Sequence, residues 1–327
     1  MKKLLSLILA LLMCISIFAF TSCEKDDGNY TVGICQLVQH PALDAATQGF
    51  IDTLKAELGE DSVTILNENA SNSPETCTTI VNNFVNKKVD LIMANATPAL
   101  QAAVNGTETI PVLGTSITEY GVALGLDDFD GLVGSNVSGT SDLAPLSEQA
   151  AMLVDLYPDA EKVALLYCSS EPNSEYQVKE IRKFLTENGL DDANIKDYSF
   201  TDSNDVNAIA AAAATFADVI YIPTDNTAAS CTETINGVIG DTPVIAGEEG
   251  ICSGCGVATL CISYYDLGVA TGKMAVKILK GYAKIEEMPI EYAATFTKKY
   301  NAAKCAELGI DIDALEEKGY IAIATEE

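Results

Sequence analysis

The chain has 327 residues, of which 48% are hydrophobic, and its formal net charge is −28 at pH 7. This length is enough for two domains, and the apolar content is enough for each domain to have its own core. Phosphate groups repel so acidic a chain, which excludes nucleic acid and disfavours anionic lipid surfaces as partners. The single histidine, His40, excludes a histidine-based catalytic triad and a metal site built from several histidines.

The first 22 residues have the layout of a secretory signal peptide. Lys2 and Lys3 precede a nearly unbroken apolar run over residues 4–20, which is short for a stable membrane span. Cys23 follows as in a bacterial lipobox, where the cysteine after the cleavage site is lipidated, although Phe20 replaces the usual leucine. An ordinary signal peptide is the alternative. The expected segments are a signal peptide (residues 1–22), a lipidation site (Cys23) and a flexible tether (residues 23–29).

Beyond the tether, β-branched apolar runs alternate with amphipathic segments, which predicts strands alternating with helices. Residues 41–59 predict a helix because Leu43, Phe50 and Leu54 keep a spacing near 3.6 residues, and Pro41 suits its first turn. The other expected helices of the first half are residues 74–88 and 98–104. Its expected strands are residues 30–38, 62–66, 89–94 and 110–113.

The same alternation restarts in the second half. The expected helices there are residues 145–157, 175–188, 204–216, 228–239 and 265–281. The expected strands are residues 162–167, 195–200, 218–222 and 243–246. Two such runs predict an α/β fold with two Rossmann-like, doubly wound lobes.

Three further segments are predicted to cross between the lobes: residues 132–140, 257–263 and 290–296. Lobe 1 is therefore expected to hold residues 30–135 and about 264–289. Lobe 2 is expected to hold residues 136–263 and about 290–327.

Ligands of open parallel sheets bind beyond the carboxyl ends of the strands, and polar residues follow most of the predicted strands. These residues are Gln39 and His40, Asn95 to Thr97, Thr115 and Ser116, Ser169 to Ser174, Thr224 to Asn226, and Gly247 to Glu249. Each residue alone is better explained as a helix N-cap. Together they predict a small-molecule site in which Asp225 pairs with a ligand ammonium. The ligand carboxylate is expected near the helix start at Thr97 and at the hydroxyls of Thr115 and Ser116.

Motifs for catalysis are missing from the sequence. It has no Walker-type phosphate loop and no Gly-x-Ser-x-Gly elbow, and residues 121–125 lack the spacing of a dinucleotide fingerprint. Cys252 and Cys255 have the spacing of a redox or metal pair, but no second pair or histidine lies nearby. We expect a glycine-rich turn there, with a local disulfide as an option. We therefore expect no cofactor and no metal, and an enzyme built on a two-lobed scaffold is the rival hypothesis.

Short motifs along nearly the whole mature chain resemble, in their order and spacing, the substrate-binding proteins of ABC importers. The resemblance is to the family that contains aromatic amino-acid binders of the tryptophan/tyrosine transport type. The motifs include LVQHPALDAATQGFID (37–52), NATPALQ (95–101), NVSGTSD (136–142), EPNS (171–174), YIPTDN (221–226) and YYDLG (264–268).

The resemblance implies a type I periplasmic-binding-protein fold with three hinge crossings and no enzymatic activity. It also implies a ligand in the cleft between the lobes, a monomer, and an ABC permease and its ATPase as partners. The ligand contacts that it implies are His40, Thr97, Thr115, Ser116, Asn173, Asp225, Asn226 and Glu248. Thr118, Glu119 and Tyr120 stand where the family often has an Asp-Pro pair, so aromatic and smaller apolar amino acids both remain candidates.

We therefore expect an exported lipoprotein, anchored by its lipid to the outer face of the cytoplasmic membrane, that binds an amino-acid-like ligand. A lipoprotein that senses its ligand and signals to a membrane receptor is an alternative, as is a binder of a sugar or a nucleoside. Sugar binders commonly stack the ring on tryptophan, and this chain has none. The candidate aromatic walls of the site are Tyr120, Tyr264 and Tyr265.

Overall fold

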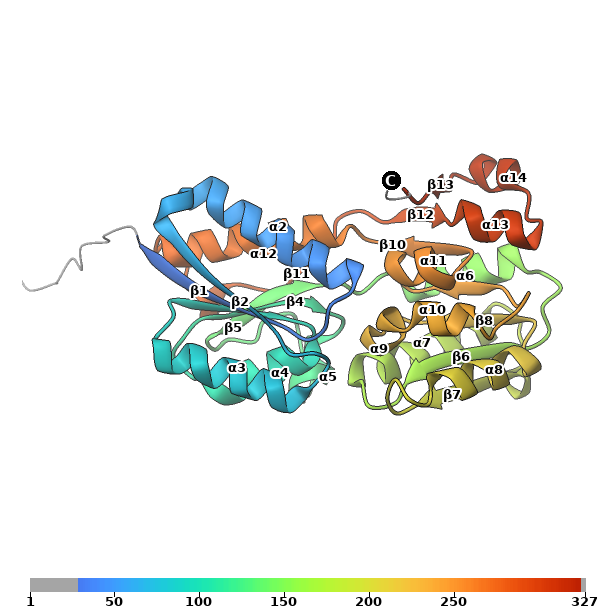
Figure 1. Ribbon diagram of the computed structural model, residues 1–327, viewed down its shortest axis with the longest axis horizontal. Coiled ribbons are helices and arrows are strands. Elements are labelled where there is room, and N and C mark those ends of the chain that lie inside the picture. Colours follow the sequence, from blue (N-terminus) through green and yellow to red (C-terminus); the bar gives the residue numbers. More distant parts are fainter. Residues whose placement is uncertain (1–28, 325–327) are drawn as a thin grey trace, which may run out of the picture.

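The computed structural model describes residues 29–324, so the expected signal peptide and Cys23 lie outside the described residues. Two sheets of mostly parallel strands form two lobes that lie end to end (Figure 1). The strand order is β11-β5-β4-β3-β1-β2 in the first sheet and β13-β12-β10-β9-β8-β6-β7 in the second. Apolar residues are buried on both faces of each sheet, beneath helices. The predicted α/β fold of two doubly wound lobes is confirmed.

The first lobe contains the N-terminal half of the described chain and one later helix. Its strands are β1 (Tyr30–Gln36), β2 (Val63–Asn69), β3 (Leu91–Asn95), β4 (Val112–Ile117), β5 (Val137–Ser141) and β11 (Glu291–Tyr292). Its helices are α2 (Pro41–Leu58), α3 (Pro74–Lys87), α4 (Thr97–Gly106), α5 (Tyr120–Leu124) and α12 (Tyr264–Leu279), with 3₁₀ turns η1 (Glu60–Ser62) and η3 (Ile285–Glu287).

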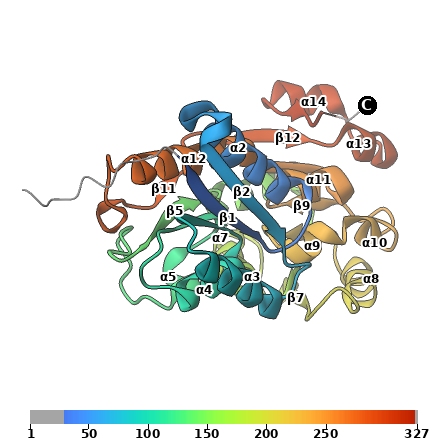
Figure 2. The same ribbon diagram turned by 60° about the vertical axis from the view of Figure 1, so that its left-hand side comes forward.

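Helices α2 and α12 cover one face of the first sheet and lie against each other (Figure 2). Glycine permits this packing, because a Cβ atom on Gly268 would lie 1.9 Å from the carbonyl oxygen of Ala46. A Cβ atom on Gly49 would likewise lie 2.1 Å from the carbonyl oxygen of Tyr265. The close contact matters for the site, since α12 leads directly out of a crossing between the lobes and α2 begins at the cleft.

The second lobe repeats the architecture with C-terminal additions. Its strands are β6 (Val163–Cys168), β7 (Ile195–Phe200), β8 (Val219–Ile222), β9 (Val244–Ala246), β10 (Ala258–Cys261), β12 (Thr297–Tyr300) and β13 (Ile321–Ala322). Its helices are α6 (Leu146–Leu156), α7 (Pro172–Glu187), α8 (Val206–Phe216), α9 (Asn226–Ser230), α10 (Thr232–Asn236), α11 (Glu249–Cys255), α13 (Ala302–Leu308) and α14 (Ile312–Glu317), with the 3₁₀ turn η2 (Asp192–Asn194).

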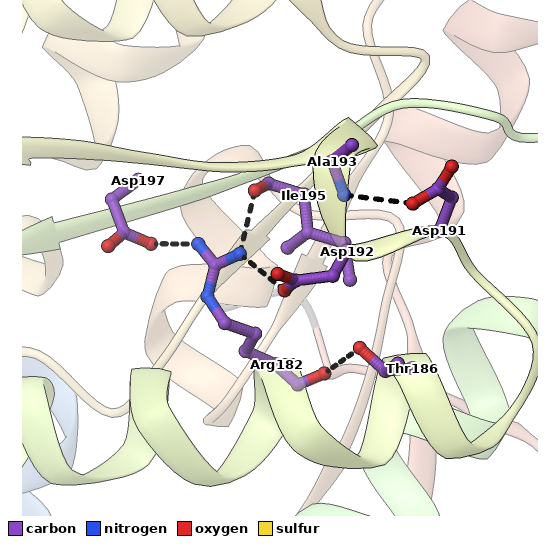
Figure 3. Close-up of polar contacts among 7 residues, drawn as sticks. All are labelled: Arg182, Thr186, Asp191, Asp192, Ala193, Ile195 and Asp197. Carbon is purple, nitrogen blue, oxygen red and sulfur yellow. Dashed lines mark hydrogen bonds and ion pairs between the residues drawn. The ribbon is translucent and has the colours of Figure 1, made fainter.

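The only arginine of the sequence fixes α7 to the edge strand of the second sheet (Figure 3). The guanidinium of Arg182 donates to Asp192 at 3.0 Å, to Asp197 at 2.7 Å and to the carbonyl oxygen of Ile195 at 2.7 Å. A planar guanidinium presents its donors in a fixed fork and can serve these acceptors at once. The ion pairs are half exposed and therefore modest, but they orient the helix whose N-terminus carries part of the site.

The chain crosses between the lobes three times, but the first crossing lies later than predicted. Residues 137–141, expected within a crossing, form β5, which pairs in parallel with β4 in the first sheet. The crossings are residues 142–145, 262–263 and 293–296, each between elements of different lobes. The predicted crossings 257–263 and 290–296 are too long, because they include β10 of the second sheet and β11 of the first. The expected lobe boundary at residue 136 therefore falls before a strand of the first lobe.

Two further expectations differ from the structure. The helix expected over residues 228–239 is two short helices, α9 and α10, separated at Cys231. Cys252 and Cys255 lie in helix α11, directly after β9, not in a glycine-rich turn. Both are buried free thiols, so the local disulfide is not formed. Between residues 29 and 324, no helix has both the length and the apolar character needed to cross a bilayer.

Candidate functional site

A cavity lies where the two lobes meet, beyond the carboxyl ends of strands from both sheets. Its walls include at least one side chain from the residues after each of β1, β4, β5, β6, β8 and β9. The lining residues are His40, Leu43, Ser116, Thr118, Asp142, Asn173, Thr224, Asp225, Asn226, Ala229, Glu248 and Tyr264. The cavity volume is about 10 Å³, which is room for about one water molecule, so the lobes are closed against each other.

His40 reaches the cavity from the start of α2. A buried network fixes this end of the helix: Thr47 donates to Gln36 at 2.6 Å, and the Asn95 amide donates to Thr47 at 3.0 Å and to the carbonyl oxygen of Leu43 at 2.9 Å. These polar side chains join α2 to the ends of β1 and β3. The network thus sets where His40 stands relative to the sheet.

The contacts of His40 determine its tautomer. The amide nitrogen of Asn226 donates to Glu171 at 2.8 Å, so the Asn226 oxygen faces His40 Nε2, 3.4 Å away. Nε2 must therefore carry the hydrogen. Burial lowers the pKa of His40 and keeps the ring neutral. Its Nδ1 is then a hydrogen-bond acceptor, and it is buried without a partner in the protein.

Asp142 and Ser116 form the floor of the cavity at the ends of β5 and β4. The Tyr264 hydroxyl donates to Asp142 Oδ2 at 2.8 Å, while Asp142 Oδ1 has no partner in the protein. Burial raises the pKa of Asp142, although the hydrogen bond from Tyr264 opposes this. Ser116 has a left-handed backbone with φ of 55°, and its buried hydroxyl also lacks a partner. An acceptor and a hydroxyl therefore face the same space.

Glu171 organises the side of the cavity that belongs to the second lobe. Its buried carboxylate accepts hydrogen bonds from the backbone and side chain of both Asn226 and Thr227, at 2.7–3.0 Å. The Asn173 amide nitrogen donates to Glu171 at 3.3 Å and to the carbonyl oxygen of Thr224 at 3.2 Å. These acceptors leave the Asn173 oxygen buried without a partner.

Asp225 and Glu248 are buried carboxyls that cap helices. Asp225 accepts from the backbone N–H of Cys168 at 2.6 Å and of Ala228 at 2.7 Å, and Glu248 accepts from the N–H groups of Gly250 and Ile251. Burial, together with the charge of Glu171, raises the pKa of Asp225 to about 8. Burial raises the pKa of Glu248 to about 7. Both acids line the cavity, but backbone donors already engage their oxygens.

Four buried polar atoms without a protein partner converge on this cavity: His40 Nδ1, Ser116 Oγ, Asp142 Oδ1 and Asn173 Oδ1. Three of them are acceptors in the protonation states set by their neighbours, and the fourth is a hydroxyl. No lysine or arginine belongs to the described residues that line the cavity. Since unsatisfied buried polar groups are costly, the arrangement suits a ligand rich in hydrogen-bond donors, such as an ammonium group.

Six of the eight predicted site residues line this cavity: His40, Ser116, Asn173, Asp225, Asn226 and Glu248. The other two, Thr97 and Thr115, lie outside it. Thr97 is buried in the first turn of α4. The Thr115 hydroxyl points to the other side of β4, where it bonds to Thr140 at 3.2 Å and to Thr271 of α12 at 3.1 Å.

Of the three tyrosines proposed as walls, only Tyr264 lines the cavity. Tyr120 is a core residue stacked on Phe129, and Tyr265 is 42% exposed on α12. The lining residues absent from the eight predicted contacts are Leu43, Thr118, Asp142, Thr224 and Ala229. Of these, Thr224 belongs to the wider predicted set of polar residues that follow strands. The signal for Asp142 is its position directly after a strand, but the small, polar residues of β5 do not predict that strand.

Comparison with known proteins identifies the family. The family described as "ABC transporter substrate binding protein" matches the chain over residues 31–317. A "Tyrosine-binding protein" from Clostridioides difficile (strain R20291) is 34% identical over 307 residues, which cover 88% of this chain and 87% of that protein. These matches confirm the predicted family and a binder rather than an enzyme.

Two solved structures indicate which state of the cleft this fold adopts. An ABC domain from Streptococcus pneumonia in complex with L-Trp is 32% identical with a TM-score of 0.83, covering 90% of this chain and 99% of that chain. The ligand-free, open structure of a substrate binding protein with adhesive properties from Clostridium difficile is 34% identical with a TM-score of 0.69, covering 91% and 100%. At similar identity, the higher score indicates that the lobes are arranged more like those of the complex than those of the open structure. Because the family match spans residues 31–317 and the relative from Clostridioides difficile is 34% identical over 88% of this chain, the chain belongs to the family of ABC transporter substrate binding proteins.

Proposed function

We propose that this protein captures a zwitterionic amino acid with an aromatic side chain between its lobes and delivers it to an ABC permease and its ATPase. The observation that carries the proposal is the convergence of four unpartnered polar atoms on a cavity with buried carboxyls. An ammonium group has three donors and no acceptor, and it matches Asp142, Asn173 and the neutral His40. The buried carboxyl of Asp225 lies beside them, and a bound cation would favour its ionised form.

Fewer residues of the cavity are available to recognise the carboxylate and the side chain of the ligand. The Ser116 hydroxyl is the side-chain donor best placed for the carboxylate of the ligand, since its oxygen has no other partner. Leu43, Ala229 and the ring of Tyr264 supply the apolar wall for a side chain. The names of two relatives, one tyrosine-binding and one in complex with L-Trp, support an aromatic ligand.

We expect a thermal-shift screen to favour L-tyrosine, L-tryptophan or L-phenylalanine over hexoses and nucleosides. A ligand present at a hundred times its dissociation constant adds about 2.7 kcal/mol to the free energy of unfolding, which gives a clear rise in Tm. L-leucine serves as the control for a smaller apolar amino acid. A rise with a sugar or a nucleoside, and none with any amino acid, would refute the proposed ligand class while leaving the family intact.

We further propose a lipid anchor on Cys23 that holds the monomeric protein at the outer face of the cytoplasmic membrane. The support is the apolar segment over residues 4–20 followed by Cys23 and a polar stretch. Cys23→Ala should move the protein from the membrane fraction to the soluble exported fraction, and mass spectrometry of the wild-type N-terminus should show a diacyl or triacyl modification. Retention of the cleaved variant on the membrane would contradict the anchor.

A further inference from the structure

We infer that Asn72 is a positioning residue that holds the closed lobes together from outside the ligand cavity. Its amide nitrogen donates across the cleft to the hydroxyl of Thr227 at 3.2 Å. Asn72 belongs to the first lobe and Thr227 to the second, and neither lines the cavity. The bond exists only when the lobes meet, so it stabilises the closed form without touching the ligand.

The turn between β2 and α3 is built to present Asn72. Ser71 and Asn72 both have left-handed backbones, with φ of 52° and 61°, which costs free energy in non-glycine residues. Backbone bonds hold this conformation: Asn72 N donates to the carbonyl oxygen of Leu37 at 2.8 Å, and Ala70 N donates to that of Gln36 at 2.9 Å. The turn is therefore fixed to the end of β1, and the side chain that it presents has a defined direction.

The acceptor of this hydrogen bond, Thr227, is also held in a fixed position. Thr227 donates its own hydroxyl hydrogen to Glu171 at 2.7 Å, so its oxygen is free to accept from Asn72. The same carboxylate holds Asn226, which faces His40 from the first lobe. One buried carboxylate thus orients two consecutive residues, and each of them meets a different residue of the first lobe. The contact at His40 belongs to the cavity, whereas the contact at Asn72 does not.

The consequence for binding follows from the closure equilibrium. Apparent affinity is proportional to the fraction of protein in the binding-competent form. A neutral hydrogen bond contributes about 0.5–1.5 kcal/mol, which corresponds to about a two- to tenfold change in the ratio of closed to open protein. Loss of the Asn72 side chain should weaken every ligand by the same factor, because the residue contacts none of them. This part of the inference rests on the proposed amino-acid ligands.

The test compares Asn72→Gly with Ser71→Gly. Glycine adopts positive φ without strain, so both variants relax the turn, but only the first removes the bond between the lobes. Dyes on Lys87→Cys and Lys183→Cys, which are exposed on α3 and α7, report closure by single-molecule energy transfer. Cys23→Ala and Cys231→Ser form the background, since Cys231 is the described cysteine that is not buried. Calorimetry then measures affinity for L-tyrosine, L-tryptophan and L-phenylalanine.

We expect Asn72→Gly to lower the closed fraction of ligand-free protein and the affinity for all three amino acids by the same factor, about two- to tenfold. Ser71→Gly should change neither quantity. An unchanged closed fraction in Asn72→Gly overturns the inference, and so does a loss confined to one ligand, which would indicate direct contact. If the wild type binds none of the three amino acids, the proposed function fails, and the closed fraction alone decides the role of Asn72.

Discussion

Asp142→Asn should weaken binding of an aromatic L-amino acid by about ten- to a hundredfold in a calorimetric titration. The substitution keeps the size of the side chain but removes the charge that faces the ammonium group. Tyr264 donates to Oδ2, so the amide oxygen is held by that hydroxyl and the NH₂ group turns toward the cavity. A charged hydrogen bond is worth about 1.5–3 kcal/mol, and here it would be replaced by a contact between two donors.

Asp225→Asn is the matched control, because backbone N–H groups already occupy both oxygens of Asp225. Its effect on affinity should be smaller than that of Asp142→Asn. The desamino analogue of tyrosine provides a second control, since wild type and Asp142→Asn should bind it equally. If Asp225→Asn causes the larger loss, the ammonium group pairs with Asp225, as the sequence alone predicted, and not with Asp142.

The free energy of unfolding of the ligand-free protein should fall as the pH rises from about 4 to about 8. Asp225 and Glu248 have folded-state pKa values of about 8 and about 7, both above their ordinary values. The folded state therefore keeps protons that the unfolded state has lost, and this stabilisation disappears as the pH passes through the folded pKa values. Each group contributes a slope of up to about 1.4 kcal/mol per pH unit while it titrates.

Urea titrations of the wild type, Asp225→Asn and Glu248→Gln at several pH values measure these slopes. Each variant should reduce the slope of the free energy of unfolding against pH, whatever its stability at any single pH. Ligand binding should lower the pKa values of both carboxyls, because a cation beside buried carboxyls favours their ionised forms. Calorimetry at pH 7 in buffers of different ionisation enthalpy should then detect proton release on binding. Equal slopes in all three proteins would remove both carboxyls as the cause.

The sequence predicted the part of the fold that depends on apolar periodicity. Strands β1 to β4 and β6 to β9 and the long helices α2 and α7 follow from the spacing of apolar residues, whereas β10 to β13 were not predicted as strands. Strand β5 does not follow from this spacing, because Val137–Ser141 is mostly small and polar although every residue is buried. Its hydroxyls find partners inside the protein: Ser138 donates to Met288 at 2.9 Å, and Thr140 bonds to Thr271 at 2.8 Å. Such partners come from distant elements, so local patterns could not reveal them.

The site was predictable at the level of the sheet edge but not of the individual side chain. Parallel strands bring their carboxyl ends together, which is why residues after five separate strands were correctly expected near one another. The direction of each side chain could not be predicted in this way. Thr115 and Ser116 are adjacent, yet one faces α12 and the other faces the cavity, because successive residues alternate sides and Ser116 has a positive φ. Missing β5 also meant missing Asp142 at its end.

Closing on an empty cleft carries a penalty that closing on an amino acid does not. Each buried polar atom without a partner costs about 1–3 kcal/mol, and four such atoms face the cavity in the closed protein. The hydrogen bond from Asn72 offsets only a small part of this cost. The unloaded protein should thus close less often than the loaded protein, so the surface formed by both lobes together indicates that a ligand is bound. A transporter that recognises this combined surface would hydrolyse nucleotide mainly for proteins that carry a ligand.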